Sequence, residues 1–164
     1  MSLPDYAELH CLSNFSFGRG ASHPEELVER AHALGYTALA ITDDASVSGL
    51  VRAHLQARTL GFHLICGAQL LLDGGCVVVL ARTLQGWGDL CALITRARRA
   101  ADKGCYRIGW DDPVLLALRD CELLLLPRPT DRTGLDRLLW RQRLAHWRLR
   151  WAAHVWLGVE LLHE

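Results

Sequence analysis

Short apolar segments that end abruptly in polar residues alternate with helical patterns along the first half of the chain. Ala7–Leu12, Ala38–Thr42 and Phe62–Cys66 have the length and composition of buried β-strands. Between them, apolar residues recur every three or four positions, as on one face of an amphipathic helix. This alternation predicts an α/β fold with a mainly parallel sheet.

Two helices are predicted between these strands. We expect Ser22 to cap the first helix and Gly35 to end it. The second is expected to begin at Ser46 or Ser48, since serine favours helix N-caps, and to end at Gly61, since glycine adopts the left-handed backbone of many helix ends.

The second half of the chain continues the alternation. The predicted elements are a hairpin around Asp73-Gly74-Gly75, a helix from about Gly88 to Ala101, a short helix at Asp112-Pro113, a strand over Glu122–Leu126, a helix from Leu135 to about Leu149 and a strand over Val155–Leu161. Gly86-Trp87-Gly88 is predicted as a turn. We expect one domain over residues 1–164. A closed α/β barrel usually needs ~200 residues or more, so an incomplete barrel, truncated on its C-terminal side, is predicted.

Polar side chains stand at the ends of the first three strands. Because the C-terminal ends of parallel strands meet at one rim, we expect His10, Asp43, Asp44 and Gln69 to face a common site. The two aspartates could bind Mg²⁺, or Asp43 could cap the helix that follows it. A hydrogen bond from His10 to Asp43 or to a backbone carbonyl is a simpler role than metal ligation.

The composition excludes several classes of protein. Lys and Arg number 18 and so do Asp and Glu, so no net charge draws the chain to nucleic acid or membrane. A hydrophobic content of 51% is too high for a disordered chain. No apolar run approaches the ~20 residues of a membrane span, and the first residues lack a signal-peptide pattern. The scattered cysteines favour a reducing compartment, and we expect a cytoplasmic protein.

Two basic stretches are candidates for nucleic-acid contact. Arg96, Arg98, Arg99 and Lys103 could touch a phosphate backbone, or could form a solvated helix end whose cations complement the helix dipole. The last helix carries Arg132, Arg137, Arg141, Arg143, Arg148 and Arg150, interleaved with tryptophans that could stack on single strands. However, Trp140, Leu144, Trp147 and Trp151 share one helical face, which favours burial.

Three segments, Tyr6–Phe17, Gly20–Leu27 and Ala38–Asp43, carry a resemblance to a known family. They resemble the PHP (polymerase and histidinol phosphatase) domain, the N-terminal module of bacterial C-family DNA polymerases (DNA polymerase III alpha-subunit-like). Within that family, they are most similar to the error-prone, damage-inducible branch. The resemblance covers essentially the whole chain and becomes looser after about Leu115.

The resemblance implies a distorted (β/α)7 barrel, of which this chain holds the N-terminal part. Active members hold several metal ions on the C-terminal rim and hydrolyse phosphoesters, as 3′–5′ exonucleases or phosphatases. This chemistry needs metal ions that lower the pKa of bound water toward ~7 and neutralise the phosphate. The family's later ligands would lie beyond Glu164.

Residue by residue, the family's ligand pattern is mostly replaced. His10 falls on the first histidine of an H-x-H motif, and Asp43 falls on the family aspartate. The other positions differ: Leu12 stands for the second histidine, Asp44 for a histidine, Gln69 for a glutamate, and Cys76 roughly where a histidine precedes the fourth strand. A leucine cannot ligate a metal, and a neutral amide compensates metal charge poorly. Only His10, Asp43 and Asp44 are left, as vestigial metal candidates, and no catalytic residue is expected.

The sequence therefore predicts a non-catalytic, structural PHP domain of an error-prone (translesion) DNA polymerase. Its expected partners are the rest of such a polymerase, accessory proteins or DNA, and an exposed sheet edge could support self-association. No cofactor is expected, with Mg, Mn or Zn bound only if the site is active. The alternatives are a stand-alone metal-dependent phosphoesterase and a module that binds single-stranded nucleic acid.

Overall fold

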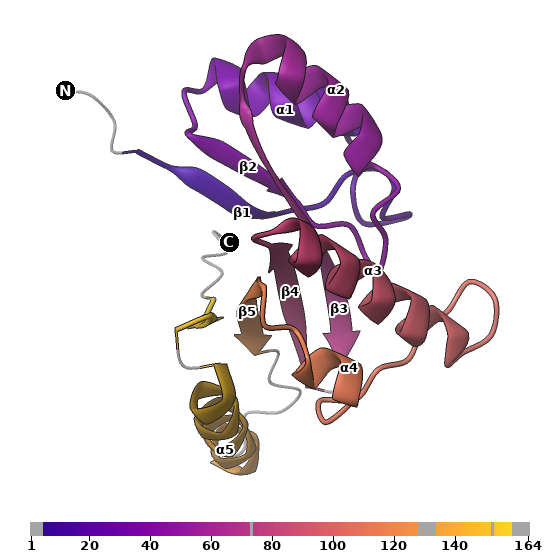
Figure 1. Cartoon of the computed structure of the whole chain (residues 1–164), viewed down its shortest axis with the longest axis vertical. Helices are drawn as coiled ribbons and strands as arrows, with labels where there is room; N and C mark the ends of the chain where they lie inside the picture. Colours follow the sequence, from indigo (N-terminus) through magenta and orange to yellow (C-terminus); the bar gives the residue numbers. More distant parts are fainter. Residues whose placement is uncertain (1–4, 73, 128–133, 152, 159–164) are drawn as a thin grey trace. The chain divides into compact units, whose positions relative to one another are not determined.

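The computed structural model describes residues 5–72, 74–127, 134–151 and 153–158, and shows an α/β fold. The chain divides into two compact units, Met1–Gln69 and Leu70–Glu164. The elements, in chain order, are β1 (Ala7–Cys11), α1 (Pro24–Ala33), β2 (Ala38–Ile41), α2 (Leu50–Leu60), β3 (His63–Leu72), β4 (Gly75–Ala81), α3 (Leu84–Arg99), α4 (Pro113–Leu116), β5 (Cys121–Pro127), α5 (Gly134–Trp151) and β6 (Val155–Leu157) (Figure 1). A single domain for the whole chain stays a prediction.

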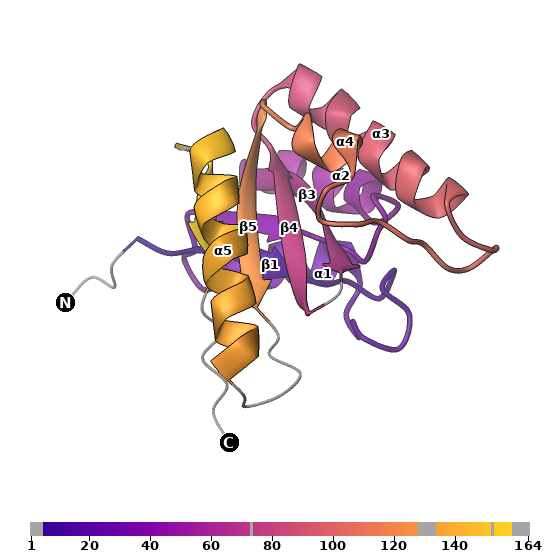
Figure 2. The same ribbon diagram turned by 90° about the horizontal axis from the view of Figure 1, so that it is seen from below.

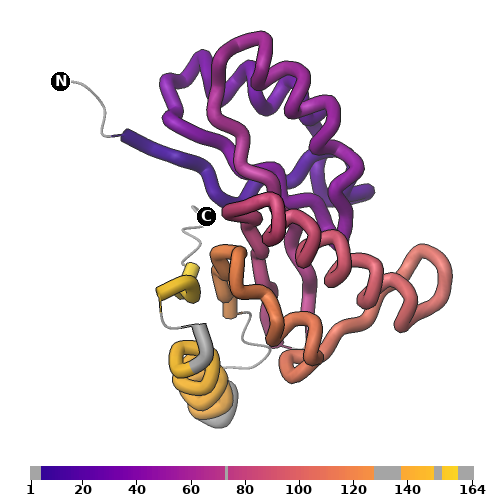
Figure 3. Tube along the Cα trace, viewed as in Figure 1, coloured from indigo at the N-terminus to yellow at the C-terminus, as the bar shows by residue number. Residues whose placement is uncertain are grey.

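The first unit is a parallel sheet with two helices packed on it. β1 pairs with β2, and β2 pairs with β3, both in parallel. α1 and α2 lie side by side, as the tube in Figure 3 also shows. The buried apolar residues that hold these elements together include Val28, Ala31, Leu39, Ile41 and Ala53. The pairing of β1 with β2 shifts in register between Glu8 and Cys11, on either side of His10.

The second unit is built around an antiparallel pair. β4 pairs with β5 from Gly75↔Pro127 to Ala81↔Cys121, and β6 adds in parallel to β5. Figure 2 shows α5 running alongside β5. The fully buried core includes Val77, Leu90, Leu93, Leu115, Leu123 and Leu125. In the part of the chain that the structure describes, no helix has the length and apolar character needed to cross a membrane.

The tryptophans of α5 are part of this second core. Trp140 and Trp147 are 7% and 1% exposed, and both pack edge-on against Trp110, with ring centroids 5.2 and 5.4 Å apart. The predicted burial of this helical face is confirmed for these two residues, because edge-to-face aromatic packing favours an apolar interior. The predictions for Arg132 and for the side chains of Arg137, Arg150 and Trp151 lie outside the described residues.

Two predicted helix starts are wrong. α1 is capped by His23 in place of Ser22: Glu26 accepts a hydrogen bond from the His23 backbone N–H at 2.8 Å, and Pro24 takes the first helical position. α2 begins only at Leu50, after Gly49, and neither Ser46 nor Ser48 caps it. The predicted end of α2 is correct, since Gly61 has a left-handed backbone with φ 63°.

Two other predicted elements also differ in the structure. The strand predicted over Phe62–Cys66 is longer in the structure: β3 begins at His63 and continues to Leu72, beyond its ladder with β2, which ends at Cys66. α3 begins at Leu84, with the Thr83 side chain accepting a hydrogen bond from the Gly86 N–H, so the predicted turn at residues 86–88 is helical. β6 ends at Leu157, and the rest of its predicted span, 159–161, lies outside the described residues.

The two glycines of α3 should respond oppositely to alanine. A Cβ on Gly86 would overlap the backbone carbonyl of Asp120, whereas a Cβ on Gly88 meets nothing within 4 Å. We expect Gly86→Ala to lower the free energy of unfolding by about 1–3 kcal/mol through overpacking. Gly88→Ala should raise it by up to about 1 kcal/mol through helix propensity. Urea unfolding of both variants measures this, and equal effects would contradict the packing seen at Gly86.

Candidate functional site

The ends of the three parallel strands in the first unit bring His10, Asp43, Asp44 and Gln69 close together. His10 lies near the end of β1, the two aspartates follow β2, and Gln69 lies in β3. Beyond β2, Asp44 forms an isolated parallel bridge with Gln69, and the Ala45 N–H donates to the Gln69 carbonyl at 2.8 Å. We call these four residues, with Ser13, Ser16 and Arg19 of the loop after β1, the strand-end site.

Asp43 is the most buried member of the site, with only 1% of its surface exposed. Its Oδ1 accepts hydrogen bonds from the Ser13 backbone N–H at 2.8 Å and from Ser16 Oγ at 2.7 Å. Its Oδ2 accepts a third from Ser13 Oγ at 2.7 Å. A buried carboxylate is tolerated only when it is hydrogen-bonded in this way, so the loop after β1 supplies the groups that stabilise Asp43.

Gly49 packs closely against Asp43 and Ser13, and this leaves no room for a side chain at position 49. A Cβ on Gly49 would come within 2.8 Å of Asp43 Oδ2 and 3.0 Å of Ser13 Oγ. Gly49 is also the residue that precedes α2, and no side chain caps that helix. The interpretation of Asp43 as a helix cap is therefore wrong, because its two oxygens are used by serines.

Gln69 connects His10 to Arg19. One end of its amide lies 2.8 Å from His10 Nε2, and the other end faces the Arg19 guanidinium. The end of the amide that faces Arg19 also lies 3.4 Å from Asp44 Oδ1. Because a guanidinium has only N–H donors, we assign the Gln69 oxygen to this end, and the amide nitrogen then donates to His10 Nε2.

Asp44 carries the second negative charge of the site. Its Oδ2 lies 3.4 Å from Arg19 Nη1, and its backbone N–H donates to Ser16 Oγ at 2.9 Å. The side chains of Arg19 and Asp44 are 29% and 23% exposed, so this ion pair is largely screened from water. Ser16 thus touches both aspartates through a single hydroxyl, accepting from one and donating to the other.

These residues do not fit a multi-metal cluster. The Asp43 carboxylate already accepts three hydrogen bonds from serines, and the Gln69 amide lies 2.8 Å from His10 Nε2, so much of the capacity of these two residues to ligate a metal is taken up. Leu12 has no donor atom to offer. Within the described ranges, no group of three or more His, Cys, Asp and Glu side chains is arranged to hold a metal ion.

Cys76 is the residue predicted to stand roughly where a family histidine precedes the fourth strand. It is the second residue of β4 itself, in the second unit, and is fully buried. Its side chain therefore belongs to the apolar core of that unit, as expected for a free cysteine in an apolar run.

Two of the basic candidates of α3 have partners inside their own unit. Arg96 lies 3.5 Å from Asp112, and the Arg98 guanidinium stacks over the Tyr106 ring at 5.4 Å. Arg99 and Lys103 are exposed. The rings of Trp140 and Trp147 are buried, so these two residues do not offer an open face on which a base could stack.

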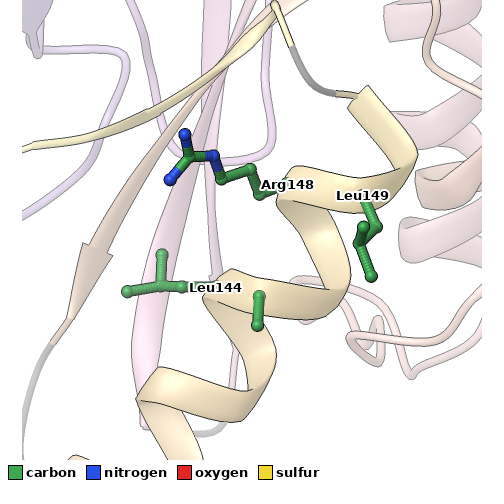
Figure 4. Close-up of a pocket in the computed structure, with 4 residues that line it drawn as sticks. Leu144, Arg148 and Leu149 are labelled. Carbon is green, nitrogen blue, oxygen red and sulfur yellow. The ribbon is translucent and has the colours of Figure 1, made fainter.

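A pocket on α5 offers little chemistry. It is lined by Leu144, Ala145, Arg148 and Leu149, and Figure 4 shows Arg148 extending on the same side of the helix as Leu144. Arg148 is the single charged side chain among these described lining residues. The strand-end site, by contrast, brings together several polar side chains.

Sequence reasoning missed Ser13, Ser16, Arg19 and Gly49. The spacing of three residues between the serines, directly after a strand, is a signal that could have placed both hydroxyls on one side of a tight turn. Arg19 lies between two glycines, and nothing local in the sequence indicates that its side chain folds back toward Asp44.

Comparison with known proteins identifies the family. Residues 8–127 match the family described as PHP domain. The chain belongs to the PHP domain family. An error-prone DNA polymerase of Methylococcus capsulatus is 50% identical over 159 residues, which are 95% of this chain and 14% of that protein. Another, from Dechloromonas aromatica, is 47% identical over 169 residues, covering 98% of this chain and 15% of the relative.

A third error-prone DNA polymerase, from Pseudomonas aeruginosa, is 48% identical over 157 residues, covering 95% of this chain and 14% of that protein. The chain thus spans only a small part of these relatives. A solved two-domain protein from Bacteroides vulgatus, described as containing a predicted PHP-like metal-dependent phosphoesterase, has a TM-score of 0.52 at 15% identity. It covers 86% of this chain and 44% of its own, and shows a shared fold. The resemblance to the PHP domain of error-prone polymerases is confirmed.

Removing the Ser16 hydroxyl should destabilise the chain. Ser16→Ala takes a donor from buried Asp43 and an acceptor from the Asp44 N–H. Hydrogen bonds to charged groups contribute about 1.5–3 kcal/mol, so we expect a loss of that order in the free energy of unfolding. Ser48→Ala, at an exposed serine of the same unit, is the control, and chemical denaturation compares them. Equal stability of the two variants would contradict the role of Ser16.

The cysteines near the strands should make stability fall at high pH. Burial, followed by the charges of Glu8 and Asp43, raises the pKa of the Cys11 thiol to about 11. Because the folded pKa exceeds the unfolded value of ~8.5, this contribution is complete below pH 8.5 and is lost as the pH rises toward 11. Cys11→Ala should flatten this decline, whereas Cys105→Ala, at an exposed cysteine, should not. Unfolding curves between pH 8 and 11 measure the difference.

Proposed function

We propose that this chain is a non-catalytic PHP domain that contributes to the architecture of an error-prone DNA polymerase. The names of its relatives and the coverage of almost the whole chain by their sequences support the polymerase context. The nucleotidyl transfer of such a polymerase, and its contacts with DNA or accessory proteins, are part of the proposal, since this chain spans 14–15% of those relatives.

One observation supports the non-catalytic role above all others. The two carboxylate oxygens of Asp43 accept hydrogen bonds from Ser13 and Ser16, and Asp43 itself is almost fully buried. A metal ion that bound this carboxylate would compete with these donors for its lone pairs and could exchange places with one of them. The energetic cost of leaving a buried hydroxyl or N–H without a partner, about 1–3 kcal/mol, opposes that exchange.

The charges of the site also argue against metal-dependent hydrolysis. Phosphoester hydrolysis needs a cation that activates water and neutralises the phosphate. Here one aspartate is satisfied by neutral donors and the other pairs with Arg19. Leu12 and Gln69 stand where the family resemblance implies a histidine and a glutamate, so the donor set has lost both a ligand and a negative charge.

A structural role accounts for the polar groups that are present. The loop after β1 reaches Asp43 after β2 and Asp44 beside β3, so the network ties three strand ends together. In a larger polymerase, such a network would keep the PHP domain rigid without any metal. The alternative, a stand-alone phosphoesterase, is left as an outcome of the test below.

The metal content and hydrolytic activity of the purified chain test this proposal. We expect substoichiometric metal by elemental mass spectrometry after purification without chelator, and no turnover of bis-p-nitrophenyl phosphate with added Mn²⁺. Two or more tightly bound metal ions, with turnover lost in His10→Ala and kept in His54→Ala, would overturn the proposal. His54 is a suitable control because it is an exposed histidine on α2 of the same unit.

A further inference from the structure

The strand-end site still has to neutralise negative charge without a metal. Asp43 and Asp44 are adjacent in the sequence, and both lie at the ends of strands in a partly or fully buried setting. The donors to Asp43 are neutral, so the positive charge that balances the two aspartates has to come from another residue. We propose that the Arg19 guanidinium is a resident cation of this site, a role that rests on the non-catalytic function proposed above.

The loop between β1 and α1 is built to return Arg19 to the site. The Arg19 and Gly20 N–H groups both donate to the Ser16 carbonyl at 3.0 Å, which closes a tight turn. Gly18 has φ 72°, a conformation that favours glycine, and a Cβ on Gly20 would overlap the Ser13 carbonyl. The two glycines that flank Arg19 are thus required by the path of the backbone that carries it back.

Arg19 contacts two residues of the site at once. Its Nη1 lies 3.4 Å from Asp44 Oδ2. Its Nη2 lies 3.1 Å from the Gln69 amide oxygen, which Nη1 also contacts. A planar guanidinium with several donors suits this double contact better than the point charge of a lysine.

The identity of residue 69 fits a resident guanidinium. Glutamine can accept from Arg19 with its oxygen and donate to His10 Nε2 with its nitrogen, whereas a glutamate has no donor to offer His10. A glutamate would also add a negative charge beside Asp44. A neutral amide at position 69 is therefore compatible with a site in which the cation is the Arg19 side chain. A carboxylate at this position would suit a site in which the cation is a metal ion.

A double-mutant cycle between Arg19 and Asp44 tests the proposal in the full chain. We expect Arg19→Met and Asp44→Asn each to lower the melting temperature by about 2–4 °C, and the double variant to lower it by clearly less than their sum. Arg19→Lys should keep part of the effect, since it retains the charge but not the fork. Arg52→Met is the matched control, because Arg52 forms an exposed ion pair with Glu25 at 3.3 Å in the same unit. It should change the melting temperature by less than Arg19→Met.

Addition of Mn²⁺ provides a second readout that a merely structural arginine would not change. In Arg19→Met the Asp44 carboxylate loses this cation, so millimolar Mn²⁺ should raise the melting temperature of that variant more than that of the wild type. An equal response of the two proteins, or strictly additive single variants, would overturn the role of Arg19.

The two proposals can fail separately. Tightly bound metal together with phosphodiester turnover in the wild type would overturn the non-catalytic function and, with it, the resident cation. A metal-free, inactive wild type with no coupling between Arg19 and Asp44 would overturn the resident cation alone.

Discussion

The first unit of this chain depends on the way in which it buries one carboxylate. Asp43 follows a strand of which every residue is buried, and it has almost no access to water. Charge in such a place is costly unless it is hydrogen-bonded, and the loop after β1 supplies three donors within four residues. The loop after β1 folds back to reach this carboxylate. Gly49, which precedes α2, lacks a side chain where one would collide with Asp43.

The same hydrogen bonds, together with one ion pair, balance the acidic residues of this site with groups of the chain itself. Acidic residues at converging strand ends repel one another, and a bound cation is one way to offset that repulsion. In this chain, hydroxyl and backbone donors satisfy one aspartate and a guanidinium pairs with the other. Gln69, a neutral amide that both donates and accepts, links this pair to His10. Each of these groups takes up a lone pair or a charge that metal binding would need, so stability and hydrolytic chemistry compete for the same atoms.

Helix starts are harder to predict than strands because a glycine can either mark a turn or allow close packing inside a helix. Gly86 and Gly88 suggest a turn when only neighbouring residues are considered. In the structure both are helical, and Gly86 is small because α3 passes directly against the backbone at Asp120. Likewise, the serines at 46 and 48 suggest a cap, but α2 begins after Gly49, which packs against the Asp43 and Ser13 side chains. In each case a contact distant in sequence outweighed a local preference.

The sequence by itself determined the α/β alternation, the buried strands, the family and the set of strand-end residues that meet in the first unit. These follow from hydrophobic periodicity and from motifs that are local in the chain. Only the tertiary structure decided what those residues do. Whether Asp43 is a ligand, a cap or a hydrogen-bonded anchor depends on which donors reach it, and those donors come from a loop about 30 residues earlier. Arg19 likewise lies beside Asp44 because of the turn in the loop that carries it, and the hydrophobic pattern and local motifs of the sequence do not predict that turn.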